Sequence, residues 1–275
     1  MEDDLPGARS ARLVAWGTAF LTGAMGLAEA AAAIAAGDEA VAHDGGETVG
    51  VDRLLARLRA DGGTGLELLL PVPGDVRGLP GPGPFSTACL DTGEGVLTRG
   101  VGRRTGLVPT TQTVGPEGDT LTVTTWTAYA VPVPELLAPP LLTVAEAEAD
   151  LRAALTDATR ELARLDTARW RPDVERPLAR MRRDIRQGGG PAADLPPVWP
   201  ARARTLLAQA DALARVLALA EGDPGAAQTG GQVRDRGQAL RGLATAVRRA
   251  RVAAYDSPAA DAVPTPSRLL DRRRV

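Results

Sequence analysis

Apolar positions near the start of the chain form one long run with few interruptions. The run from Leu13 to Ala36 holds a single charge, Glu29, and glycines break it at positions 23 and 26. Helical spacing on either side of this break predicts two short buried helices, roughly residues 10–22 and 26–36. Much of the run is alanine, which inserts poorly into membranes, so we expect neither a membrane span nor a signal peptide.

The next segments switch between helical and strand periods. Residues 51–63 place leucines at helical intervals before a Gly pair, and Leu66–Leu70 form a short apolar run typical of a buried strand. "PFSTACLDTGE", from residue 84, predicts a helix of two or three turns. Residues 106–115 and 119–131 alternate with period two around the turn "GPEGD" at 115–119, which predicts an antiparallel hairpin. This half therefore reads as a small α/β layer with one central strand and a hairpin beside it.

The second half has a helical period throughout. Thr143 and Glu146 form a capping box ahead of a heptad pattern in which Leu155 is expected to be buried at the centre. Three further helices are predicted around residues 174–185, 206–220 and 233–255, and Trp199 is expected to anchor the loop 193–200. Short connections favour an antiparallel bundle of about four helices, with coiled-coil-like packing. The fold class is α+β.

Charge supports a division of the chain into two parts. Residues 1–142 carry a formal charge of −8, whereas residues 143–275 carry +6. We therefore predict an N-terminal α/β part at residues 1–139 and a C-terminal helical bundle at residues 140–256. The tail at 257–275 is rich in Pro, Ser, Ala and Arg, which predicts disorder.

Composition removes several kinds of chemistry. All 32 basic residues are arginine, so this arginine-rich sequence has neither a P-loop lysine nor a Schiff-base lysine. Cys89 and His43 are the single cysteine and histidine, which argues against a disulfide, a structural zinc and a triad. His43 lies in "HDGGE", which is typical of a surface loop. We predict no catalytic residue, no metal ligand and no cofactor.

The segment "PVPGDVRGLPGPGP" at 71–84 follows the predicted strand, at a position where α/β layers bind ligands. Its alternating prolines remove every second backbone N–H, so it is poorly suited to hold a phosphate and better suited to be a rigid connector. A ligand site remains the alternative, in which Asp75 orients a hydroxyl or water, Arg77 holds an anion, and Ser86 and Thr87 line the crevice.

The most basic stretch is at residues 169–187, which hold seven arginines. Aromatic residues for base stacking are not interleaved with them, so a solvated helix face, or docking on the acidic first half, is favoured over nucleic-acid binding.

Three segments, "RLVAWGTAFLTG" at 12–23, "LPVPGDVRGLPGPGPF" at 70–85 and "DTARWRP" at 166–172, resemble a group of uncharacterised actinobacterial proteins. The resemblance spans most of the chain and implies no activity, cofactor or site residue.

The function expected from the residues is non-enzymatic, a protein-interaction or scaffolding role through the bundle surface. The alternative is binding or transformation of a small anionic ligand around residues 71–87. We expect a cytoplasmic protein, with a secreted form cleaved near "AEA" at 28–30 as the alternative. The oligomeric state does not follow from the sequence.

Overall fold

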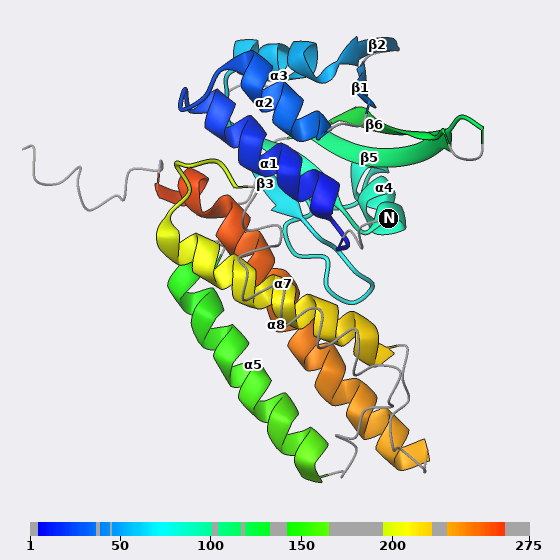
Figure 1. Cartoon of the computed structure of the whole chain (residues 1–275), viewed down its shortest axis with the longest axis vertical. Coiled ribbons are helices and arrows are strands. Elements are labelled where there is room, and N and C mark those ends of the chain that lie inside the picture. Colours follow the sequence, from blue (N-terminus) through cyan, green and yellow to red (C-terminus); the bar gives the residue numbers. More distant parts are fainter. Residues whose placement is uncertain are drawn as a thin grey trace, which may run out of the picture.

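The computed structural model describes residues 5–36, 39–44, 46–100, 104–116, 119–132, 142–164, 195–221 and 230–261. The chain has the predicted α+β class, with a mixed sheet and short helices in the first half and long helices in the second (Figure 1). Below, "sheet part" means residues 5–132 and "helical part" means the long helices.

The sheet part contains six strands in the order β2-β1-β6-β5-β4-β3. Neighbouring strands are antiparallel except for β1 and β6, which are parallel. The bounds are β1 Glu39–Asp44, β2 Glu47–Gly50, β3 Gly63–Leu69, β4 Gly95–Gly100, β5 Thr105–Val114 and β6 Leu121–Ala130.

The predicted hairpin is confirmed as β5 and β6, but the predicted central strand is wrong. That strand, β3, lies at one edge of the sheet. Its apolar character arises because both of its faces are covered, so that Leu68 and Leu69 enter different hydrophobic clusters. The "HDGGE" segment is also not a plain loop, because His43 and Asp44 end β1 and Glu47 begins β2.

Short helices cover both faces of the sheet. Helices α1 (Ala8–Leu21) and α2 (Leu27–Ala35) confirm the two predicted buried helices, and α3 (Val51–Ala60) and α4 (Pro84–Thr92) also form where expected. Gly17 of α1 approaches β3 so closely that a Cβ would lie 2.5 Å from a Leu66 methyl carbon. On the opposite face, the ring of Phe85 in α4 packs over Gly106 and contacts Tyr129. The sheet thus separates two hydrophobic clusters.

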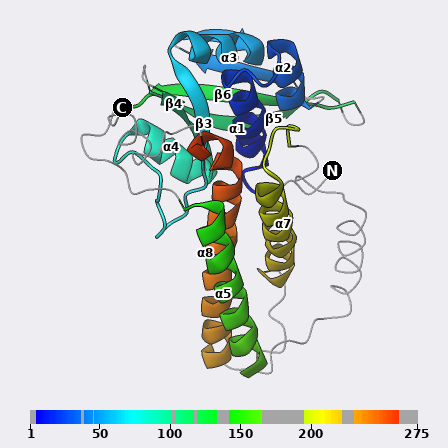
Figure 2. The same cartoon turned by 90° about the vertical axis from the view of Figure 1, so that its left-hand side faces the viewer.

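The helical part consists, in the described ranges, of α5 (Val144–Arg164), α7 (Ala201–Glu221) and α8 (Gly230–Asp261). Helix α8 packs along both α5 and α7 (Figure 2). The predicted helix at 174–185 lies outside the described residues, so the count of about four and the antiparallel arrangement stay predictions. Thr143 and Glu146 do form the capping box, since each backbone N–H bonds the other side chain at 3.2 Å or less.

The predicted burial of Leu155 is wrong, because 39% of its surface is exposed. The buried stripe of α5 instead runs through Ala147, Leu151 and Ala158, with Ala154 packed against the same cluster. Alanines allow close approach of α8, so the contact line follows them rather than the larger leucines.

Helix α8 continues through residues 257–261, which the sequence placed in the disordered tail. Pro258 lacks the N–H that would bond the carbonyl of Ala254. That carbonyl instead accepts from the indole N–H of Trp199 at 3.0 Å and from the hydroxyl of Ser257 at 3.1 Å. Trp199 is 3% exposed, so the predicted anchor is confirmed.

Candidate functional site

The loop after β3 begins with a tight turn. Val72 and Asp75 exchange two backbone hydrogen bonds, at 3.1 and 2.9 Å, and Gly74 between them has a φ of 87°, which favours glycine. The turn holds the Asp75 side chain toward α8.

The Asp75 carboxylate joins the two halves of the chain. Its Oδ2 accepts from Nη2 of Arg248 at 2.8 Å and of Arg249 at 3.4 Å, and its Oδ1 lies 3.7 Å from Nε of Arg77. Burial would raise the pKa of Asp75, but the Arg248 hydrogen bond and the nearby guanidinium charges outweigh it and hold the pKa below its usual value. Asp75 is therefore an ionised anchor between the loop and α8.

The other two candidate residues face the loop itself. The hydroxyl of Ser86 donates to the carbonyl of Gly81 at 2.5 Å, and that of Thr87 to the carbonyl of Gly83 at 3.2 Å. The structure thus brings Asp75 and Arg77 together, while the described contacts of Ser86 and Thr87 hold the loop against the start of α4.

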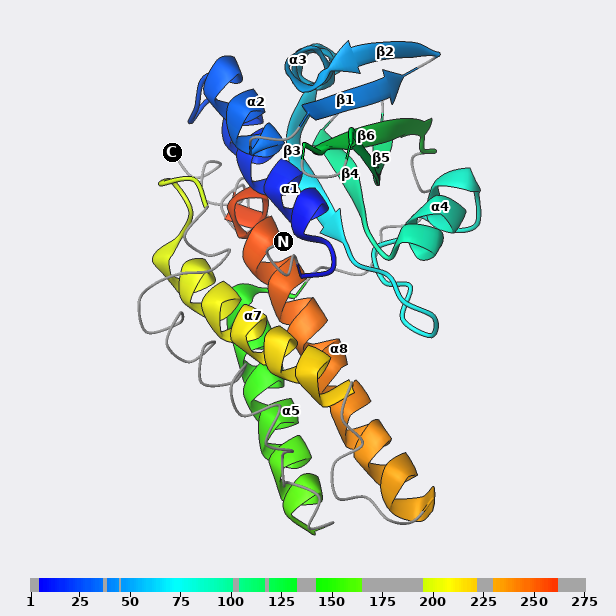
Figure 3. The same cartoon turned by 45° about the vertical axis from the view of Figure 1, so that its right-hand side comes forward.

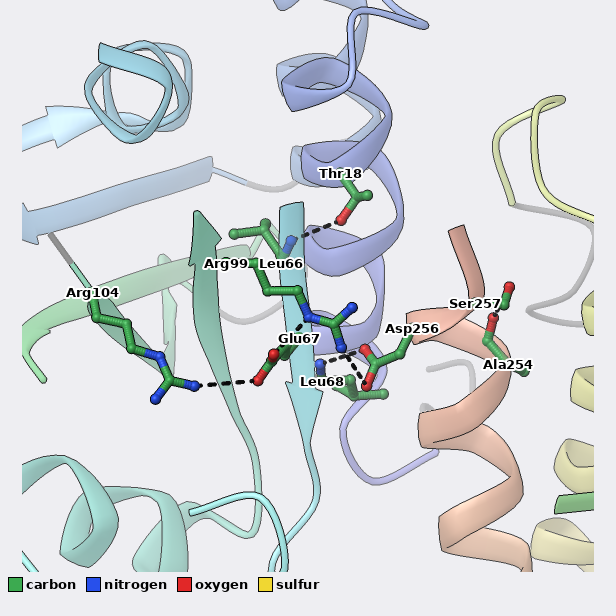
Figure 4. A network of polar contacts seen from close by, with 9 residues as sticks. All are labelled: Thr18, Leu66, Glu67, Leu68, Arg99, Arg104, Ala254, Asp256 and Ser257. Atoms are coloured by element: carbon green, nitrogen blue, oxygen red, sulfur yellow. Dashed lines mark hydrogen bonds and ion pairs between the residues drawn. The ribbon is translucent and has the colours of Figure 1, made fainter. Parts of the chain in front are cut away.

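A second set of polar contacts lies where α8 meets β3 (Figure 4). The N–H of Leu68 donates to Oδ1 of Asp256 at 3.0 Å, and the N–H of Leu66 donates to the hydroxyl of Thr18 at 3.1 Å. Both N–H groups point away from β4, so side chains from α8 and α1 close this edge of the sheet.

Arginines on the neighbouring strands complete this network. Nε of Arg99 donates to Glu67 at 2.6 Å, its Nη2 lies 3.9 Å from Oδ2 of Asp256, and Arg104 lies 3.7 Å from Glu67 (Figure 4). Burial raises the pKa of Asp256 to about 7, although the Arg99 charge and the Leu68 N–H act in the opposite direction. A buried carboxyl with a near-neutral pKa therefore sits at the junction of the two halves.

A third contact fixes α8 to the N-terminal segment and to α7. Nη1 of Arg251 donates to the carbonyl of Pro6 at 2.7 Å, and its Nε lies 3.0 Å from Oδ1 of Asp211. Burial raises the pKa of Asp211 to about 6, against the lowering effect of the Arg251 and Arg215 charges.

Sequence reasoning missed these α8 residues. Arg248, Arg249 and Arg251 were indistinguishable from other arginines in a basic half, and Asp256 was taken as the start of a tail. One signal was present for Asp211, a lone charge within the apolar stretch from Leu206 to Leu213, because buried charges need a partner.

The single cysteine and histidine occupy structural positions. Cys89 is buried, and burial, together with the Glu94 charge, raises the pKa of its thiol to about 12, which keeps it protonated and unreactive. His43 is exposed on β1, where its Nδ1 lies 2.8 Å from the hydroxyl of Thr48. In the part of the chain that the structure describes, no group of three His, Cys, Asp or Glu side chains could hold a metal ion.

The contacts described above define an α+β protein whose two parts meet along the second half of α8. Family models of Rv1486c-like proteins match both parts, the N-terminal domain at residues 10–141 and the C-terminal domain at residues 145–252. The chain belongs to the family of Rv1486c-like proteins, whose description states no activity, ligand or partner. Searches of curated proteins and of solved structures found no match to the chain. Among the described helices, none has both the length and the apolar character needed to cross a membrane.

Proposed function

We propose that this protein is a non-enzymatic interaction or scaffolding protein that binds a protein partner through its helical part. The supporting observation is the division of α8. Its second half is buried against β3 and α1 through Arg251 and Asp256, whereas its first half runs with α5 away from the sheet part (Figures 1 and 2). An arrangement with one docked end and one projecting end is suited to presenting helix surfaces to a partner.

The projecting end carries large aliphatic side chains in water. Leu155 of α5 is 39% exposed and Val233 of α8 is 54% exposed. Leu155 lies two helical turns beyond Glu148, which pairs with Arg202 at the start of α7, so it is on the same face of α5. We propose Leu155 as the centre of the contact, on an antiparallel bundle of about four helices in a cytoplasmic protein.

Site-specific photocrosslinking in cells tests this role. A benzophenone side chain at position 155 should capture a defined protein. Val233→Glu should abolish the capture if the projecting end is the contact, since a charge in an interface must lose water. The same crosslinker at Thr64, an exposed residue on the opposite part of the molecule, is the control. Equal capture of the same proteins from positions 64 and 155 would contradict the proposal.

A second candidate, binding of a small anion near residues 71–87, rests on the charge around Asp75. Three guanidinium groups surround this one carboxylate, and the Arg77 side chain is 68% exposed. The excess positive charge, rather than the loop backbone, would attract a phosphate or carboxylate. The hydroxyls of Ser86 and Thr87 would contribute only after breaking their bonds within the loop.

Thermal shifts distinguish this candidate. Phosphate and citrate should raise the melting temperature of the wild type, because a ligand that binds only the folded protein stabilises it. Arg77→Ala should remove that rise. Arg160→Ala is the matched control, since Arg160 is 72% exposed and pairs with Asp157 at 2.9 Å. A rise that persists in Arg77→Ala, or none in the wild type, would refute anion binding at this place.

A further inference from the structure

Strand β5 is covered on one side for only part of its length. Its first residues lie between two strands, since Gly106 and Leu107 pair with β4. Pairing with β6 continues to Val114, which lies opposite Leu121. From Pro109 onward, β5 is therefore the outer strand of a hairpin that projects beyond the sheet (Figure 3). Residues 110–114 are all exposed.

Hydrogen-bond alternation tells which backbone groups face the open side. The N–H groups of Leu66 and Leu68 point away from β4, so Glu67 is one of the residues whose backbone faces it. The groups of Val96 in β4 then face β5, where Leu107 lies opposite. Odd-numbered residues of β5 consequently face away from β6. Even-numbered ones face it, in agreement with the bond from the N–H of Val131 to the carbonyl of Arg104.

The open side thus presents the backbone of Pro109, Thr111 and Thr113, which we call the β5 edge. It offers the N–H groups of Thr111 and Thr113 and three carbonyl oxygens, because proline has no N–H. Within the described ranges, no backbone group bonds these positions on that side. Residues 110–114 carry no charge, so nothing on the edge repels another strand.

The two outer parts of the sheet are therefore treated differently. The N–H groups of β3 are closed by Thr18 and Asp256, whereas those of the β5 edge remain available. An open, uncharged, threonine-rich edge is suited to pairing with an extended strand.

We propose that the β5 edge pairs with the β5 edge of a second copy of the chain, antiparallel about a two-fold axis. Thr111 lies opposite the partner's Thr111, and the two exchange both of their hydrogen bonds. The N–H of Thr113 then donates to the carbonyl of the partner's Pro109. This register uses every outward N–H and places the proline where no donor is needed.

Other registers fit less well. A shift toward the turn would direct the Thr111 N–H at Gly115, beyond the end of β5. A shift in the other direction would require the backbone of Leu107, which β4 already occupies. The strand is hence self-complementary in one register, and that singles out a second copy as the occupant. The inference is independent of both proposed functions.

Charge pairs at position 111 test the register. Sedimentation velocity of the full chain should show a dimer that forms with rising concentration. Thr111→Lys and Thr111→Asp should each raise the dimer dissociation constant by at least about tenfold, because like charges then lie directly opposite. An equimolar mixture of the two variants should recover the dimer, since opposite charges meet. Thr120→Lys, at an exposed position in the hairpin turn, should leave the dimer unchanged.

Thr111→Pro supplies a second test, because it removes a donor that has no partner within the described chain. It should weaken the dimer and leave the circular dichroism spectrum unchanged. A wild type that stays monomeric at all concentrations overturns the proposal. So does a dimer that persists in both charged variants, or a mixture that fails to recover it.

Discussion

At the scale of single residues, the junction holds two buried carboxyls whose pKa values are raised in the same direction. Asp256 reaches about 7 and Asp211 about 6, because burial disfavours their charged forms more than the adjacent arginines favour them. The folded protein therefore binds protons that the unfolded chain releases. Stability from these groups is present at low pH and is lost as the pH rises through the folded pKa values.

Asp256→Asn should remove much of this dependence. Asparagine keeps an oxygen for the Leu68 N–H but does not titrate. Between the ordinary pKa of 3.8 and about 7, wild-type stability should fall relative to the variant as the pH rises. We expect the difference in unfolding free energy to change by roughly 2–4 kcal/mol across this window. Urea denaturation at a series of pH values measures it.

Asp150→Asn, at an exposed position of α5, is the matched control and should follow the wild type at every pH. Parallel curves for the wild type and Asp256→Asn would mean that the Asp256 carboxyl titrates alike in the folded and unfolded states.

At the scale of elements, long periodic segments were predictable and short or alanine-rich ones were not. The helices near 10–22, 26–36 and 51–63 and the β5–β6 hairpin follow from strong local periods. Strands β1 and β2 have six and four residues with mostly polar surroundings, so tertiary pairing rather than local pattern determines them. In α5, the pattern located the helix but not the buried face, because alanine fits both a core and a surface.

The α5 correction gives a paired stability prediction. Leu151→Ala should lower the unfolding free energy by about 2–5 kcal/mol, because Leu151 is 4% exposed and its truncation leaves a cavity. Leu155→Ala should cost less than about 1 kcal/mol, since Leu155 is largely in water. Chemical denaturation of both variants measures the difference. Similar losses at the two positions would show that α5 buries another face in solution.

At the scale of the whole molecule, α8 is the element that joins the two halves. Asp75 and Arg77 were identifiable from their turn, but the Asp75–Arg248 pair spans 173 residues and no local pattern could indicate it. The same is true of the bond from Leu68 to Asp256, which spans 188 residues. Contacts of this range make the sheet part and α8 depend on each other, even though the charge asymmetry suggests two separate units.

The junction can be tested by one substitution in two molecules, the full chain and a fragment that starts at Pro140. The fragment should be helical and melt cooperatively, as the predicted division of the chain requires. Arg248→Ala should lower the unfolding free energy of the full chain by about 1–3 kcal/mol, because it leaves the largely buried Asp75 carboxylate with a weaker partner. In the fragment, which lacks Asp75, the same substitution should have almost no effect. Calorimetry of the four proteins measures both outcomes. An equal loss in chain and fragment would mean that Arg248 acts within the helical part, and an unfolded fragment would mean that the two halves form a single folding unit.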